Sequence, residues 1–138
     1  MTATVTCPSV LFDAECALCH WSLAHLLRRD RHEKLRIVPL RSPDAAVLLP
    51  RLTAAERAAA AHLVTADGRV LSGGAAALPL ARLLGAGAPV IALLRMLGAV
   101  TPCGYRLIAA KRALLSRLVT PCARRRADCT LARRLARI

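Results

Sequence analysis

The stretch that most constrains this chain joins an apolar run to a pair of closely spaced cysteines. Residues 10–13 read Val-Leu-Phe-Asp, and Cys16 and Cys19 follow at the spacing C-x-x-C. Residues 21–27 then place apolar side chains at a helical period, which indicates an amphipathic helix. The pattern therefore predicts a strand followed closely by a helix, with both cysteines at the beginning of that helix.

The predicted position of the two cysteines favours chemistry at sulfur. Unpaired backbone N–H groups and the helix dipole stabilise a thiolate at a helix N-terminus, and the thiolate is the nucleophile. Residues three apart on a helix have Cβ atoms about 5–6 Å apart, so a small adjustment brings Cys16 and Cys19 to disulfide distance. A disulfide across so short a loop adds little stability. We therefore expect reversible exchange, with Cys16 as the attacking thiol and Cys19 as the resolving thiol.

Two carboxylates lie beside the cysteines in the sequence. Asp13 stands three residues before Cys16, where it either takes the proton released during disulfide formation, orients the loop, or caps the helix. Glu15 precedes Cys16 directly, and a neighbouring carboxylate disfavours a thiolate. Asp13 is therefore the third candidate site residue.

The motif Asp13-x-x-Cys16-x-x-Cys19 after an apolar strand resembles the signature of the DCC family of thiol-disulfide oxidoreductases. Further similarities follow at residues 37–42, 63–70, 72–76 and 105–112, so that the resemblance covers roughly residues 9–118. The resemblance implies a thioredoxin-like α/β fold and thiol-disulfide exchange without a bound organic cofactor. The chain departs from the family pattern at Ala14, where glycine is usual, and no proline precedes His62, where thioredoxins proper have a cis-proline before a strand.

The remaining pattern fits an α/β domain with a small mixed sheet, flanking helices and an extra C-terminal helical segment. Residues 44–61 predict two helical pieces separated near Pro50, with Thr53 and Glu56 as a capping box. Residues 62–72 predict a hairpin about Asp67-Gly68. Two short buried helices are expected between residues 73 and 100, and another helix from about 103 to 119.

We divide the chain into a thioredoxin-like domain, residues 1–119, and a basic tail, residues 120–138. The tail contains Cys122, Cys129 and several arginines, and the whole chain carries a net charge of +13. Such charge attracts anionic partners, so the tail offers a contact surface for nucleic acid or an anionic membrane. The expected partners of the dithiol are a disulfide-containing protein or small thiol substrate and an external thiol reductant.

The cysteines also bear on the compartment of the protein. Six cysteines occur without a basic and apolar leader at the N-terminus, so we expect no secretory signal and a cytoplasmic location. Cys7 is expected to be an ordinary thiol at the start of the first strand, with a third redox role as the alternative.

Three other interpretations of the cysteines and the charge stay open at this point. Cys16 and Cys19 form a zinc site if Cys103, Cys122, Cys129 or a histidine completes it, although a second closely spaced cysteine pair is absent. The segment Cys16-x-x-Cys19-His20 also matches the short haem-attachment pattern. A basic module that binds nucleic acid or a membrane surface is the third, but only 2% of the residues are aromatic, which leaves few platforms for stacking on bases.

Overall fold

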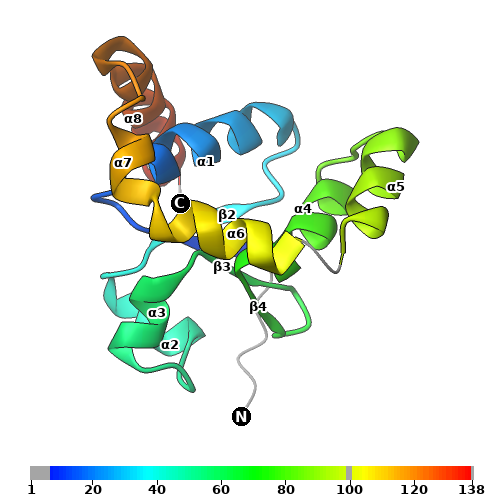
Figure 1. Cartoon of the computed structure of the whole chain (residues 1–138). Helices are drawn as coiled ribbons and strands as arrows, with labels where there is room; N and C mark the ends of the chain where they lie inside the picture. Colours follow the sequence, from blue (N-terminus) through cyan, green and yellow to red (C-terminus); the bar gives the residue numbers. More distant parts are fainter. Residues whose placement is uncertain (1–6, 99–100, 138) are drawn as a thin grey trace.

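The computed structural model describes residues 7–98 and 101–137, and a four-stranded mixed sheet lies at its centre (Figure 1). The strand order is β2-β1-β3-β4, with β1 parallel to β2 and antiparallel to β3, which is in turn antiparallel to β4. The strands are β1 (Ser9–Phe12), β2 (Arg36–Pro39), β3 (His62–Val64) and β4 (Val70–Ser72). This arrangement confirms the predicted thioredoxin-like α/β fold and the predicted hairpin.

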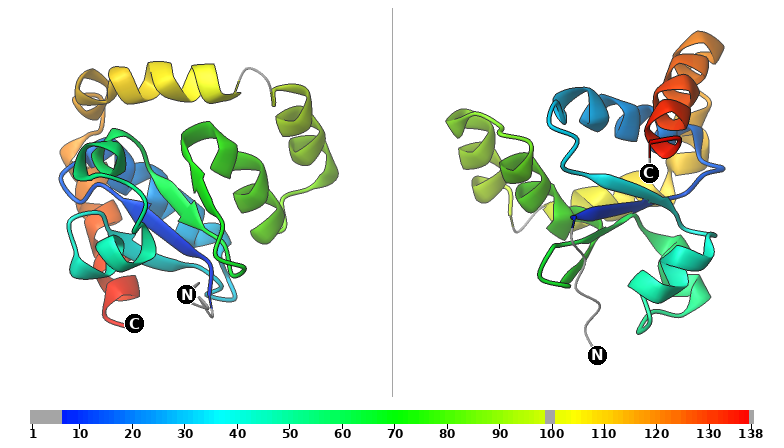
Figure 2. Two further views of the ribbon diagram at one scale, coloured as in Figure 1. Left: turned by 90° about the horizontal axis from the view of Figure 1, so that it is seen from below. Right: turned by 180° about the vertical axis from the view of Figure 1, so that it is seen from behind.

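The central strand is buried because helices cover both faces of the sheet. All four residues of β1 are buried, and a strand covered on both faces reads as a continuous apolar run, as residues 10–12 do. Figure 2 shows the helices α1 (Ala17–Arg29) and α8 (Pro121–Leu135) on one side of the sheet and α2 (Pro43–Leu48) with α3 (Ala54–Ala59) on the other. The core accordingly has two parts, one on each face.

Local sequence signals explain the helices nearest the sheet. The buried side chains of α1, including Leu23, Ala24 and Leu27, recur at helical spacing, and Leu23 and Leu27 pack in the same apolar cluster as β1. The predicted interruption between α2 and α3 is confirmed, as is the capping box that begins α3. In that box the Glu56 N–H donates to Thr53 Oγ1 at 3.2 Å, and the Thr53 N–H donates to Glu56 Oε2 at 2.8 Å.

The helices after the hairpin differ from the expectation. A 3₁₀ turn, η1 (Gly73–Ala76), leads into α4 (Ala77–Leu83) and α5 (Ala88–Met96), but neither α4 nor α5 contains a buried residue. The prediction of two buried helices was therefore wrong about burial. The physical reason is that other helices already cover both faces of the sheet, so the apolar residues of α5 have few surfaces left to pack against.

The predicted helix of residues 103–119 is present as two helices. They are α6 (Thr101–Ala110) and α7 (Arg112–Ser116), separated at Lys111, whose backbone leaves the helical conformation. In the part of the chain that the structure describes, no helix is both long enough and apolar enough to cross a membrane.

The C-terminal helix α8 packs against α1 and shares its core. Ala127 and Leu131 are buried, and Leu131 belongs to the same apolar cluster as Val10 of β1. A buried ion pair between Arg134 and Asp30 fixes the end of α8 to the end of α1. The division into residues 1–119 and 120–138 stays a prediction, whereas residues 121–135 form an ordered helix on the main body.

Candidate active site

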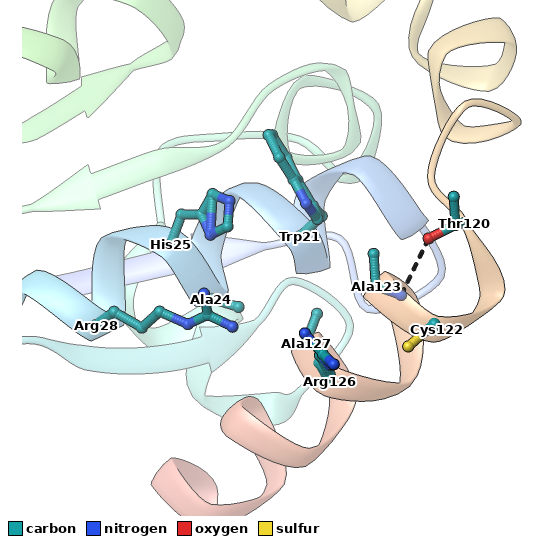
Figure 3. Close-up of a pocket in the computed structure, with 9 residues that line it drawn as sticks. All are labelled: Trp21, Ala24, His25, Arg28, Thr120, Cys122, Ala123, Arg126 and Ala127. Carbon is teal, nitrogen blue, oxygen red and sulfur yellow. Dashed lines mark hydrogen bonds between the residues drawn. The ribbon is translucent and has the colours of Figure 1, made fainter.

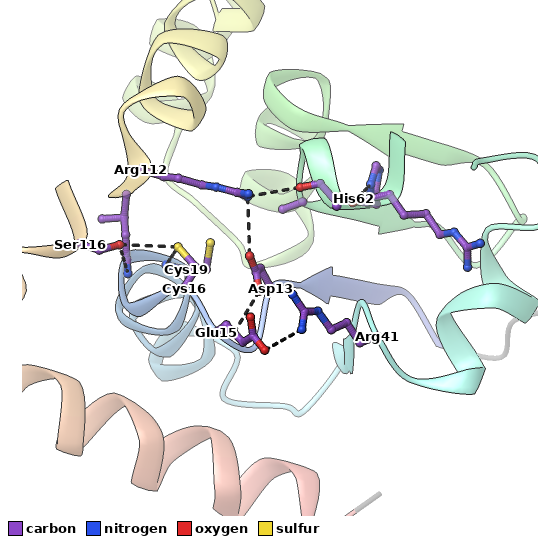
Figure 4. A network of polar contacts seen from close by, with 12 residues as sticks. Asp13, Glu15, Cys16, Cys19, Arg41, His62, Arg112 and Ser116 are labelled. Carbon is purple, nitrogen blue, oxygen red and sulfur yellow. Dashed lines mark hydrogen bonds and ion pairs between the residues drawn. The ribbon is translucent and has the colours of Figure 1, made fainter. Parts of the chain in front are cut away.

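Cys16 is the N-cap of α1, and it follows β1 by a short loop. The Cys16 N–H donates to the carbonyl of Asp13 at 3.3 Å, which closes that loop. The Cys16 Sγ in turn accepts the Cys19 N–H at 3.3 Å, and its side chain is buried, with the residue only 8% exposed (Figure 4). The prediction that the cysteines begin the helix is thus confirmed, and one N–H group of the first turn already points at the Cys16 sulfur.

Cys19 lies one turn further along α1 in a different environment. Burial raises the pKa of the Cys19 thiol from 9.0 to about 12, and the hydrogen bond and charge of Cys16 and the charge of Asp13 add to the rise. Arg112 acts in the opposite direction and lowers it. The Cys19 thiol therefore stays protonated at neutral pH while Cys16 is unreacted.

Asp13 orients the loop and does not cap the helix. Its Oδ1 accepts the Glu15 N–H at 3.0 Å, and its Oδ2 lies 3.7 Å from Nη1 of Arg112. Because the capping side chain is Cys16, the interpretation of Asp13 as the N-cap was wrong. The carboxylate is held between the loop and a guanidinium, close enough to Cys19 to raise the pKa of that thiol.

Glu15 is paired with a cation that the sequence did not connect to it. The Arg41 Nη1 donates to Glu15 Oε1 at 2.6 Å, and both side chains are exposed. The ion pair offsets the repulsion between the Glu15 carboxylate and a Cys16 thiolate.

Two residues of α7 approach the dithiol from the far end of the chain. Ser116 Oγ accepts the Leu18 N–H at 3.3 Å and lies 3.8 Å from Cys16 Sγ. Arg112 faces Asp13 and also donates to the carbonyl of Ala58 at 3.3 Å. From the sequence, Arg112 stands out only because residues 105–112 resemble a helix of the DCC family. Ser116 cannot be found from local sequence patterns, because its partners lie about a hundred residues away.

Tyr105 of α6 forms a wall beside the same site. Its hydroxyl accepts the Ala61 N–H at 2.8 Å, and its ring lies so close to Gly73 that a Cβ there would be 2.8 Å from Cδ1 of Tyr105. Burial raises the pKa of the Tyr105 hydroxyl, and the charges of Cys19 and Cys16 add to the rise. A cavity of about 500 Å³ is lined by Tyr105, Arg106, Arg112 and small residues of α3, η1 and α6.

The other cysteines lie apart from this site. Cys7 Sγ donates to the carbonyl of Lys34 at 3.2 Å, and Cys103, Cys122 and Cys129 are exposed free thiols. Within residues 7–98 and 101–137, no three side chains of His, Cys, Asp or Glu gather into a group that could hold a metal ion.

A second cavity, of about 270 Å³, lies between α1 and α8 (Figure 3). Trp21, His25 and Arg28 line it from α1, and Cys122 and Arg126 line it from α8.

The haem-attachment pattern Cys16-x-x-Cys19-His20 ends in a histidine that has a partner within the protein. The His20 Nδ1 lies 2.7 Å from Asp128 Oδ1.

A dithiol at the N-terminus of the helix that follows the central strand of a mixed sheet defines a thioredoxin-like dithiol protein. The sequence model of the DCC1-like thiol-disulfide oxidoreductases matches residues 10–118, and the chain belongs to this family. The resemblance seen in the sequence is therefore confirmed. Neither a curated protein nor a solved structure matches the chain.

Proposed function

We propose that the protein reduces disulfides through nucleophilic attack by Cys16 and resolution by Cys19. The observation that carries the proposal is the asymmetry of the pair. The Cys16 sulfur accepts a backbone N–H at a helix N-terminus, whereas burial and the neighbouring charges raise the pKa of Cys19. A backbone donor therefore faces the sulfur of Cys16, whereas the thiolate form is disfavoured at Cys19, and this asymmetry suits an attacking and a resolving thiol.

The exchange proceeds in two balanced steps. The Cys16 thiolate attacks a substrate disulfide R–S–S–R′, which forms Cys16–S–S–R and releases R′–S⁻. The Cys19 thiol then loses its proton and attacks the Cys16 sulfur, which forms the Cys16–Cys19 disulfide and releases R–S⁻. An external dithiol reductant returns the protein to the reduced state by the reverse exchange, and no bound organic cofactor takes part.

The residues around the pair have distinct parts in this scheme. The Ser116 hydroxyl and the Cys19 N–H, both close to the Cys16 sulfur, stabilise its thiolate. We assign the proton of Cys19 to Asp13 in the resolving step, because the charge of Asp13 acts on Cys19 and its carboxylate is held in place by Arg112. The pKa of Cys19 falls once Cys16 is in a mixed disulfide, because the negative charge on Cys16 is then gone.

The cavity beside Tyr105 and Arg112 supports a substrate that carries negative charge near its disulfide. Arg106 and Arg112 supply cations at its wall, and small residues such as Ala59 and Ala109 leave room for an extended chain. A disulfide-containing protein or small thiol of this kind is the proposed substrate. We place the reaction in the cytoplasm, where thiol reductants keep paired cysteines available for exchange.

The arginine-rich tail is a further proposed contact site for nucleic acid or an anionic membrane. Part of its charge is used inside the molecule, because Arg134 pairs with Asp30 and Arg137 pairs with Glu33 at 2.6 Å. Arg124 and Arg125 remain exposed on α8 and supply the charge for such a contact.

Single serine substitutions test the dithiol mechanism. Cys16→Ser is expected to abolish reduction of a small disulfide, because the attacking sulfur is gone. Cys19→Ser is expected to retain the first step and to accumulate a mixed disulfide at Cys16, detected by mass spectrometry of the intact protein. Cys103→Ser, at an exposed thiol outside the site, is the matched control and is expected to behave as the unsubstituted protein. Full activity of the Cys16→Ser variant would overturn the proposal.

A further inference from the structure

The helices α5, α6 and α7 carry most of the large apolar side chains that the fold leaves strongly exposed. Among the described residues, all but one of the large apolar side chains that are more than half exposed belong to the region of these helices, and the exception is Val47 of α2. They are Leu93, Met96, Leu107, Ile108, Leu114 and Leu118. Met96, at 83% exposed, is the most accessible of them. Clusters of exposed apolar side chains mark contact surfaces, whereas single ones do not.

The charges of the same region are all of one sign. Residues 68–127 contain no Asp or Glu, and Arg95, Lys111 and Arg117 are exposed on or beside the three helices. In the described part of the chain, none of these three cations forms an ion pair, whereas Arg134 and Arg137 do. We call these exposed apolar and cationic side chains together the basic apolar face.

Part of the basic apolar face lies on the side of α6 opposite Tyr105. Leu107 follows Tyr105 by two residues, which turns it about 200° around α6 from the wall of the cavity. Figure 2 shows α6 along one edge of the molecule, with α5 at one end and α7 at the other. The exposed side chains of the three neighbouring helices are accessible to a partner, while Tyr105, Arg112 and Ser116 of α6 and α7 make their contacts inside the molecule.

We infer that the basic apolar face binds the surface of an anionic membrane. Leucine and methionine side chains enter the boundary between headgroups and acyl chains, while arginine and lysine reach the phosphates. The uniform positive charge complements anionic lipid. It disfavours contact with a second copy of the same face, because the like charges of the two copies would repel each other. The inference concerns the outer sides of α5–α7 and is independent of the dithiol mechanism.

Vesicle flotation of the full chain tests this inference. The chain is mixed with vesicles of phosphatidylcholine alone or of phosphatidylcholine with phosphatidylglycerol. We expect binding only to the vesicles with phosphatidylglycerol, and weaker binding at high salt because the attraction is partly electrostatic. Absence of binding to the anionic vesicles at low salt would overturn the inference.

Matched variants locate the contact. The double variant Met96→Glu/Leu107→Glu is expected to reduce vesicle binding by more than about tenfold, because it replaces buried apolar contacts with charges that anionic lipid repels. Val47→Glu, at an apolar position on α2 that is 67% exposed, is the control and is expected to bind as the unsubstituted chain. Reduction of a small soluble disulfide is expected to stay unchanged in both, which also shows that they fold.

The remaining outcomes each contradict the inference. An equal loss of vesicle binding in Val47→Glu would show that added negative charge weakens binding wherever it is placed. Loss in Arg124→Ala/Arg125→Ala with none in Met96→Glu/Leu107→Glu would move the contact to α8. A concentration-dependent dimer in sedimentation that Met96→Glu/Leu107→Glu abolishes, without vesicle binding, would make a second copy the occupant of the face.

Discussion

The same kinds of residue have opposite environments in two regions of the molecule. One region is the body, formed by the sheet, α1 and α8, and the other consists of the outer helices α5–α7. In the body, leucines such as Leu11 are fully buried, and the cation Arg134 is paired with the buried Asp30. In the outer helices, leucines such as Leu93 are more than half exposed, and Arg95 forms no ion pair with another described residue. Folding thus accounts for the residues of the body, whereas the exposed apolar side chains of the outer helices fit the proposed contact with a membrane surface.

Removal of a buried charge partner provides the largest test of this comparison. Asp30→Ala removes the buried carboxylate that pairs with the Arg134 guanidinium, 11% exposed, and leaves it Glu33, at 3.5 Å, as its ion-pair partner. It also frees the N–H groups of Lys34 and Leu35, which donate to Asp30. We expect the free energy of unfolding to fall by about 3–5 kcal/mol. Arg95→Ala, on the outer helices, is expected to change it by less than about 0.5 kcal/mol. Urea denaturation measures both, and equal effects would remove the distinction between the regions.

Truncation of leucine in the two regions is expected to have the next largest effect. Leu11→Ala creates a cavity at a position that is 0% exposed, and we expect a loss of about 3 kcal/mol in the free energy of unfolding. Leu93→Ala removes a side chain that is 54% exposed, and the expected change is within about 0.5 kcal/mol. A large loss with Leu93→Ala would show that α5 is covered in solution, contrary to the structure.

A smaller effect is expected where the outer helices meet the dithiol. Ser116→Ala removes the hydroxyl that accepts the Leu18 N–H and lies 3.8 Å from Cys16 Sγ. We expect a loss of about 1 kcal/mol in stability and a several-fold slower first exchange step. Ser116→Thr keeps the hydroxyl and is expected to restore most of the rate. An unchanged rate of the first exchange step in Ser116→Ala would show that the Ser116 hydroxyl of α7 takes no part in the reaction.

The pH dependence of stability gives a separate test at the dithiol. Burial raises the pKa of Cys19 from 9.0 to about 12 in the folded state, so the folded chain binds more protons than the unfolded chain between these values. Its contribution is fully present below pH 9 and is lost as the pH rises toward 12. Cys19→Ser is therefore expected to show a shallower decline in stability above pH 9 than the unsubstituted chain, as measured by urea denaturation. Parallel curves of stability against pH for the two chains would contradict the raised pKa of Cys19.

The sequence predicted the features that depend on neighbours along the chain. The strand before Cys16, the helix that Cys16 caps, the hairpin and the Thr53–Glu56 capping box each follow from local periodicity or spacing, and the structure contains all of them. The family signature is equally local, because Asp13, Cys16 and Cys19 lie within one loop and one helical turn.

The features that the sequence did not predict depend on which distant surfaces meet. The approach of Ser116 to Cys16 and the pair of Arg134 with Asp30 join segments about a hundred residues apart, and no spacing rule connects them. The exposure of α5 was missed for a related reason. An apolar run shows that residues prefer burial, but whether another element covers them depends on the whole packing arrangement.

The central claim is that Cys16 and Cys19 form a reversible redox pair, and a titration in glutathione buffers tests it most directly. Mass spectrometry locates the disulfide at each potential, and a metal assay is run on the same sample. We expect a single reversible Cys16–Cys19 disulfide with a potential between roughly −270 and −120 mV. Failure of these two cysteines to pair with each other at any potential, or stoichiometric zinc that protects both thiols until it is chelated, would contradict the claim.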